Sequence, residues 1–158
     1  VLQKYGEEHR IVMYGKGMGA NTILNTAGHG RLKNVDLIIS EGAYDNVYNY
    51  LTYTCQKETK VAKMVCGPII RRVIKNELKT DIKKMDTVSL VKKNSIPTIY
   101  VHSKNDKDVP FAMVFPLYNN DHSHKMLFPI KEEHLYDFKD RKDSYAVSFV
   151  EFVNENMK

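Results

Sequence analysis

Apolar residues along the chain form short runs that alternate with longer amphipathic stretches. The runs predict buried strands at residues 10–14, 35–40, 97–102 and 126–128. The stretches carry apolar residues at helical spacing, and they predict helices at residues 21–27, 45–57, 68–78, 86–93, 111–118 and 145–153. Strands that alternate with helices are typical of βαβ units, so the fold class expected is α/β, with a parallel sheet of about four strands flanked by helices.

Glycine, proline and aspartate mark the expected ends of these helices. Gly28 and Gly30 end the first helix, and Asp45 is placed to cap the start of the second. Pro68 opens the third, because proline fits the first turn of a helix. Pro116 falls inside the helix at 111–118 and must kink or shorten it. The elements follow one another without a linker, so residues 1–158 are expected to form a single domain, or part of one.

Composition restricts the classes of protein that remain. The 158 residues are 42% hydrophobic and 27% charged, as in soluble globular proteins. No apolar run is long enough to span a bilayer, and the first residues lack a signal pattern, so a cytoplasmic protein without a membrane span is expected. The net charge of +5 is spread among acidic residues, without a basic stripe. Binding of nucleic acid is therefore not expected.

Two small groups of residues invite a metal or redox interpretation. Cys55 and Cys66 are too few for a disulfide framework and lack zinc-site spacing, so they are interpreted as reduced structural thiols. His122 and His124 stand close together and could bind a metal, but two histidines at the edge of a loop are common without one. Neither a metal nor a cofactor is predicted.

A glycine-rich turn lies between the first strand and the first helix, with the sequence Gly15-Lys16-Gly17-Met18-Gly19-Ala20. One interpretation is a dinucleotide-binding βαβ unit, in which Gly15 and Gly17 approach a pyrophosphate and Glu41 binds a ribose hydroxyl. The other is a nucleophile elbow, in which Gly17 holds the central, strained position and Gly15 and Gly19 let strand and helix approach closely.

Four stretches in sequence order favour the elbow. The run from Tyr14 to Ala20 resembles the elbow of α/β-hydrolases of the esterase and serine-peptidase-like branch, in which Ser-Met-Gly-Ala is common. Residues 101–110 resemble that family's His-Gly-x-x-Asp-x-x-Val-Pro motif, with Asp106 at the acid position. Residues 131–134 resemble the loop that carries the catalytic histidine, here His134. Residues 40–44 resemble the segment after the sheet strand that follows the elbow.

The resemblance implies the C-terminal half of an α/β-hydrolase fold, related to enzymes that act on ester or amide substrates. It places Asp106 as the acid, His134 as the base and the backbone N–H of Met18 in the oxyanion hole. Gly17 stands where the family has its serine, so the nucleophile position is vacant. A catalytically impaired protein is expected, either a natural pseudoenzyme or an engineered variant, whose ligand is a small acyl compound.

Several alternatives stay open at this stage. The pocket could serve a non-catalytic binding or interaction module, or His134 could activate a water in place of the serine. Asp108 could replace Asp106 as the acid, whereas Lys16 and His102 are better explained as a solvated and a structural residue. In the family, earlier strands cover the elbow strand. A missing N-terminal half or a partner chain is therefore expected beside residues 10–14.

Overall fold

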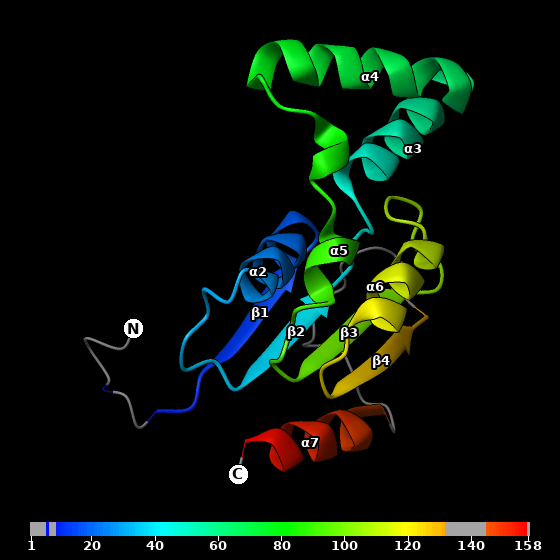
Figure 1. Cartoon of the computed structure of the whole chain (residues 1–158). Helices are drawn as coiled ribbons and strands as arrows, with labels where there is room; N and C mark the ends of the chain where they lie inside the picture. Colours follow the sequence, from blue (N-terminus) through cyan, green and yellow to red (C-terminus); the bar gives the residue numbers. More distant parts are fainter. Residues whose placement is uncertain (1–5, 7–8, 132–144, 158) are drawn as a thin grey trace.

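A computed structural model describes residues 6, 9–131 and 145–157 of the chain. Its centre is one parallel sheet with the strand order β1-β2-β3-β4 (Figure 1). The four strands are β1 (Val12–Lys16), β2 (Leu37–Glu41), β3 (Thr98–Ser103) and β4 (Lys125–Ile130). The predicted α/β class with about four parallel strands is confirmed, with strand ends shifted by one or two residues.

Helices cover both faces of the sheet. One face carries α2 (Met18–Gly28), α5 (Thr87–Val91) and α6 (Val114–Asn120), and the other carries α7 (Tyr145–Asn156). Strand residues alternate between the two cores with period two. Ile38 and Tyr100 pack with α2 and α6, whereas Leu37 and Ile99 share the opposite core with Phe152 of α7.

Two further helices stand together beyond the carboxyl ends of the strands (Figure 1). They are α3 (Val47–Thr59) and α4 (Lys63–Leu78), followed by the short 3-10 helix η1 (Ile82–Lys84). The prediction that Asp45 caps α3 is wrong by one residue. The side chain of Asn46 accepts the N–H of Asn49, while Asp45 accepts from the backbone of Asn46 and the side chain of Asn49.

The two prolines within helical segments behave differently. Pro68 lies inside α4, which already begins at Lys63, so the prediction that this proline opens the helix is wrong. At this point α4 packs closely on α3, because a Cβ added at the neighbouring Gly67 would collide with the hydroxyl of Tyr48. Pro116 lies in the first turn of α6, where its missing N–H has no intrahelical acceptor to lose. The predicted segment is shortened, because a 3-10 turn, η2 (Phe111–Met113), replaces its start.

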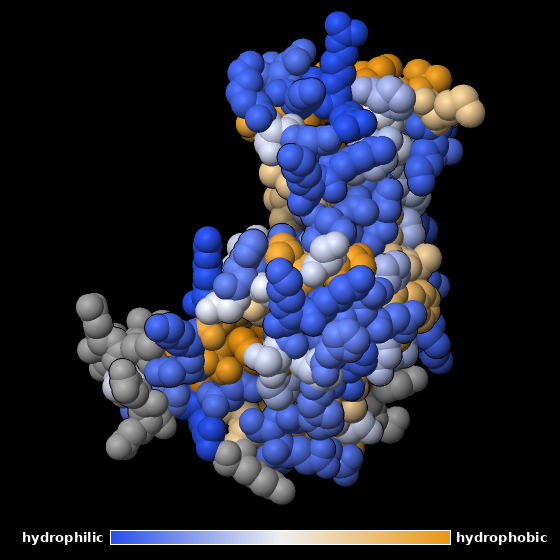
Figure 2. Space-filling model, viewed as in Figure 1, coloured by the Kyte–Doolittle hydropathy of each residue, from blue (hydrophilic) through white to orange (hydrophobic). Residues whose placement is uncertain are grey.

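The exposed surface is largely polar, with an apolar rim on the α3–α4 hairpin (Figure 2). Met64, Ile69 and Val73 of α4 are 86%, 55% and 50% exposed. Among the described residues, no helix has the length and apolar character needed to cross a membrane. Because all four strands are parallel, their carboxyl ends lie at one edge of the sheet, where loops from distant parts of the sequence meet.

Candidate active site

The turn after β1 has the backbone geometry of a sharp strand-to-helix elbow. Gly17 has φ 51° and ψ −118°, the conformation of the first central residue in a type II′ turn, which glycine adopts without steric cost. The N–H of Gly17 donates to the carbonyl oxygen of Glu41 at 2.8 Å, and the Gly17 carbonyl accepts from Asn21 in α2 at 3.2 Å. The turn therefore connects β1 to α2 while remaining fixed to the end of β2.

The strand and the helix cross closely at Gly15. A Cβ at this position would lie 2.7 Å from the carbonyl carbon and oxygen of Gly19 and 2.7 Å from Cδ1 of Ile23. Gly19 itself is not crowded, since a Cβ there would meet no heavy atom within 4 Å. The elbow motif predicts that both positions need a small residue, but the packing requires a residue without a Cβ only at Gly15.

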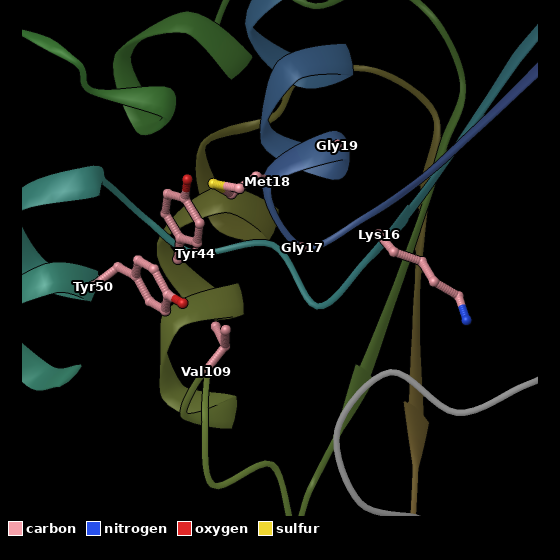
Figure 3. Close-up of a pocket in the computed structure, with 7 residues that line it drawn as sticks. All are labelled: Lys16, Gly17, Met18, Gly19, Tyr44, Tyr50 and Val109. Atoms are coloured by element: carbon pink, nitrogen blue, oxygen red, sulfur yellow. The ribbon is translucent and has the colours of Figure 1, made fainter. Parts of the chain in front are cut away.

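A pocket of about 350 Å³ opens beside the elbow (Figure 3). Tyr44 and Tyr50 form one wall, where their rings stack with centroids 4.6 Å apart and an interplanar angle of 7°. Burial raises the pKa of the Tyr44 hydroxyl, and Tyr50 raises it further, so Tyr44 stays neutral at physiological pH. The residues that line the pocket are Lys16, Gly17, Met18, Gly19, Tyr44, Tyr50 and Val109.

Asn21 holds the Tyr44 wall in place, a role that the sequence interpretation missed. Its buried side chain donates to the Tyr44 carbonyl at 2.6 Å and to the Thr87 hydroxyl at 3.0 Å, and it accepts the Tyr44 N–H at 3.1 Å. One amide therefore ties α2 to the loop after β2 and to the start of α5. The signal available in the sequence was a polar residue on the buried face of a helix, where asparagine has low helix propensity.

Asp106 lies in the loop after β3, at the same edge of the sheet. Its carboxylate is nearly inaccessible, with 1% side-chain exposure, and its Oδ1 accepts the N–H groups of Asp108 and Val109 at 2.8 Å each. Nε2 of His102, which is fully buried in β3, lies 2.9 Å from the Val109 carbonyl oxygen and 3.7 Å from Asp106 Oδ2. This set of contacts fixes the Asp106 loop and turns Val109 into the pocket beside Gly17.

The two neighbouring aspartates differ sharply in their surroundings. Asp108 is 53% exposed in its side chain and pairs with Lys57 of α3 at 2.6 Å. The hydroxyl of Tyr53, also in α3, donates to the Lys107 carbonyl at 3.0 Å. Only Asp106 is buried in the manner expected of an orienting carboxylate, whereas Asp108 fastens the loop to the α3–α4 hairpin.

The position predicted for the base, His134, lies outside the described residues. The structure does describe the strand that precedes it. Ile130 at the end of β4 pairs with Ser103 at the end of β3, three residues before Asp106. The N–H of Lys104 also donates to the Ile130 carbonyl at 2.8 Å. The chain thus leaves β4 beside the Asp106 loop.

Two other candidates near the turn face away from the pocket or are already engaged. Glu41 is 1% exposed, and the Tyr14 hydroxyl donates to its Oε2. Lys16 Nζ lies 4.0 Å from Glu41 Oε1, and Figure 3 shows the Lys16 side chain running to the opposite side of the turn from Tyr44 and Tyr50. Glu41 therefore belongs to the interior of the sheet edge, which is a poor arrangement for the ribose contact of the dinucleotide interpretation.

The described residues do not contain a cluster of three or more histidine, cysteine, aspartate or glutamate side chains that could hold a metal ion. His124, one of the two neighbouring histidines, is committed to α7. Its Nδ1 lies 2.9 Å from Asn156 Oδ1, and its ring packs on Phe152 with centroids 4.6 Å apart.

The fold is that of the α/β-hydrolases. The Pyrococcus furiosus esterase Pf2001 matches with a TM-score of 0.71 and 13% identity over 99% of this chain and 58% of its own. The Pyrococcus horikoshii acylaminoacyl peptidase matches with a TM-score of 0.66 and 18% identity, over 99% of this chain and 26% of its own. Acetyl xylan esterase 1 from Thermoanaerobacterium sp. JW/SL YS485 matches with a TM-score of 0.61 and 19% identity, over 94% of this chain and 46% of its own.

In sequence, the chain is 24% identical over 156 residues to the uncharacterized protein YqkD of Bacillus subtilis (strain 168). That similarity covers 97% of this chain and 51% of YqkD, so the chain spans about half the length of this relative. No protein-family model matches the chain.

Proposed function

We propose that this chain carries an α/β-hydrolase site for acyl substrates in which Gly17 occupies the nucleophile position. The observation that carries the proposal is the backbone of Gly17, with φ 51° and ψ −118°, at the carboxyl end of β1 and in the wall of a pocket. A nucleophile elbow needs this geometry so that the central side chain stands clear of both strand and helix. The esterase and peptidase neighbours in structure support the same class of chemistry.

Asp106 and His134 are assigned as the acid and the base. The burial of Asp106 and its two backbone hydrogen bonds support an orienting role, because a fixed, desolvated carboxylate holds an imidazole in one tautomer. His134 follows the last residue of β4 by four positions, a reach of about 13 Å at full extension. Since β4 ends beside the Asp106 loop, a span of this length is long enough to reach Asp106, and this supports the assignment of His134 as the base.

Met18 supplies one oxyanion donor in this assignment. It is the first residue of α2, and the N–H groups in the first turn of a helix have no intrahelical acceptor. Such an N–H points outward at the positive end of the helix dipole, where developing negative charge on a carbonyl oxygen is stabilised.

Glycine has no side-chain oxygen, so an acyl-enzyme cannot form at position 17. The remaining groups bind an acyl compound and orient a base, but they supply only the residual catalysis that a triad retains without its nucleophile, roughly 10³–10⁴-fold over water. The protein as given is therefore assigned as a catalytically impaired member of this structural class.

The open side of β1 suggests how the site is completed. Within the described residues, β1 pairs only with β2, and Val12 and Tyr14 are 38% and 43% exposed. The chain spans 51% of YqkD and 58% of the Pf2001 esterase. We infer that another segment or a partner chain pairs with β1. If the partner is a second copy of this chain, Val12→Lys should lower self-association in sedimentation. A chain that is monomeric with and without the substitution would exclude a second copy as the partner.

The nucleophile assignment is tested with two matched variants, Gly17→Ser and Gly17→Ala. Each is incubated with short-chain p-nitrophenyl esters and with a fluorophosphonate, which labels only an activated serine. We expect ester hydrolysis and labelling at position 17 in Gly17→Ser, and neither in Gly17→Ala or the unmodified chain. A folded Gly17→Ser variant that is neither labelled nor active even when joined to the segment that pairs with β1 would overturn the assignment of the elbow.

A further inference from the structure

The α3–α4 hairpin brings the two cysteines of the chain together. Cys55 lies in the last two turns of α3 and Cys66 in the first turn of α4, and their Sγ atoms are 2.7 Å apart. Both thiols are free. A disulfide bond has an S–S length of about 2.05 Å, so the Sγ atoms need to move only roughly 0.7 Å closer to bond.

The two thiols differ in access. Cys66 is 1% exposed, and its Sγ donates to the Val61 carbonyl oxygen at 3.5 Å, whereas Cys55 is half-buried. The hydrogen bond that Cys66 shares with Cys55, together with burial, raises the pKa of the Cys66 thiol. The hydroxyl of Thr59 lies 3.9 Å from Cys55 Sγ and 4.0 Å from Cys66 Sγ. An external reagent therefore meets Cys55 first, with Cys66 directly behind it.

We propose that Cys55 and Cys66 form a redox-active dithiol, which a small-molecule disulfide of the glutathione type oxidises to an intramolecular disulfide. The Cys55 thiolate attacks one sulfur of the reagent, and the reagent's S–S bond breaks to release one thiolate. Cys66 then attacks Cys55 Sγ, gives up its proton, and displaces the second reagent thiolate. Two protein thiols are oxidised to one disulfide, the reagent is reduced to two thiols, and the two cysteine protons pass to them.

The cross-link joins two helices whose first member reaches the elbow pocket. Tyr50 of α3 lines that pocket, and Lys57 of α3 pairs with Asp108 in the loop that carries Asp106. The bond would hold Cys55 and Cys66 together in open states of the hairpin and so limit local unfolding. The oxidised form therefore has a more rigid pocket wall. This site needs no chemistry at Gly17, so it stands or fails independently of the proposed hydrolase function.

The test uses the whole 158-residue chain, either fully reduced or incubated with oxidised glutathione. Intact mass and free-thiol titration report the product. We expect both thiols to disappear together, the mass to fall by that of two hydrogen atoms, and dithiothreitol to reverse the change. Amide hydrogen exchange across residues 47–78 should slow at least about tenfold in the oxidised form. Two stable glutathione adducts, a disulfide-linked dimer, or unchanged exchange would overturn the proposal.

Single variants test the order of attack. Cys66→Ser should accumulate one glutathione adduct on Cys55, because the resolving thiol is gone. Cys55→Ser should leave Cys66 unmodified in the folded chain and reactive only after unfolding in urea. Equal reaction of the two variants in the folded state would contradict the assignment of Cys55 as the attacking thiol. The unmodified chain gives the mass readout by itself if either variant fails to fold.

Discussion

Gly15 faces the backbone of Gly19 so closely that a Cβ at Gly15 would lie 2.7 Å from the carbonyl carbon and oxygen of Gly19. Real Cβ atoms do not approach backbone atoms to this distance, so strand and helix must move apart if a methyl group is added. We expect Gly15→Ala to lower the free energy of unfolding by about 1–3 kcal/mol, the cost typical of overpacking, measured by urea denaturation.

Gly19→Ala is the matched control for this prediction. A Cβ at Gly19 meets no heavy atom within 4 Å, and alanine is favoured over glycine inside a helix by roughly 0.5–1 kcal/mol. We therefore expect this variant to be as stable as the unmodified chain or slightly more stable. Equal destabilisation by both substitutions would show that the tight crossing is not at Gly15.

The backbone of Gly17 predicts a second stability effect, separate from any activity. A residue with a Cβ is strained at φ 51° and ψ −118°, at a cost of about 1–3 kcal/mol. Gly17→Ala and Gly17→Ser should therefore both unfold at lower urea concentration, by similar amounts. If either variant matched the unmodified chain in stability, the turn would have relaxed to another conformation.

The amide of Asn21 predicts a third effect, on the wall of the pocket. Asn21→Asp keeps the shape but removes both N–H donors, so the Tyr44 carbonyl would face a carboxylate oxygen instead. The buried carboxylate would keep the Tyr44 N–H as a donor to one oxygen, but its other oxygen would face the Tyr44 carbonyl. We therefore expect a loss of at least about 2 kcal/mol in the free energy of unfolding. The near-ultraviolet circular dichroism of the stacked Tyr44 and Tyr50 should weaken as well. Thr22→Ser, on the exposed face of α2, serves as a control with little expected change.

The sheet could be predicted from the sequence because each strand is a short run of mainly apolar residues, and the two central strands, β2 and β3, are buried on both faces. Leu37 and Ile38 are neighbours in β2 but pack into opposite cores, so both positions are apolar. A continuous apolar run of this kind is typical of a strand buried on both faces. The α4 helix was harder to delimit. It begins at Lys63, five residues before Pro68, and Gly67 lies close to the hydroxyl of Tyr48 in α3, a tertiary contact that the local sequence does not reveal.

The candidate site likewise contains residues that a sequence motif predicts and residues that only the tertiary structure brings together. Gly17 and Asp106 could be predicted because a motif places each within three residues of the end of a strand, where the parallel sheet brings strand ends together. The tyrosine wall could not be found this way, since Tyr44 and Tyr50 belong to different elements and meet only through the Asn21 hydrogen bonds and ring stacking. The assignment of His134 stays a prediction from the sequence.

The ion pair between Asp81 and Arg71 predicts a dependence of stability on pH. Arg71 donates to both carboxylate oxygens of Asp81, at 3.1 and 2.5 Å, and with the N–H of Lys83 it lowers the pKa of Asp81 from 3.8 to about 2. A carboxyl whose pKa is lower in the folded state stabilises the fold fully above its unfolded pKa. This contribution is lost as the pH falls from about 4 towards 2.

We therefore expect Asp81→Asn to be less stable than the unmodified chain at pH 6, with a gap that narrows as the pH falls from about 4 towards 2. Urea midpoints measured at each pH give the comparison. Arg71→Gln should reduce the pH dependence of the unmodified chain, because it removes the main cause of the shift. If the difference in stability between Asp81→Asn and the unmodified chain stayed constant with pH, the pKa of Asp81 would not be lowered by folding.

The side chain of Asp106 has two separable roles: it accepts backbone hydrogen bonds within its loop, and in the proposal its negative charge orients the base. Variants that separate these roles test the assignment of Asp106 as the acid. Asp106→Asn retains a carbonyl oxygen that can accept the N–H groups of Asp108 and Val109, so the loop should stay folded. Asp106→Ala removes that acceptor and leaves both N–H groups unpaired, at a cost of about 1–3 kcal/mol. In stability alone, the asparagine variant should therefore resemble the unmodified chain more than the alanine variant does.

Activity should follow a different order in the Gly17→Ser background. Under the proposed assignment, both Asp106 variants lose the carboxylate that orients the imidazole of His134, so ester hydrolysis should fall by as much as roughly 10⁴-fold, or to the detection limit, in each. Asp108→Asn is the matched control, because that carboxylate is exposed and paired with Lys57, and its activity should stay within about twofold of the background. If Asp108→Asn abolished hydrolysis and Asp106→Asn did not, the acid would be Asp108, and the buried loop around Asp106 would have a purely structural role.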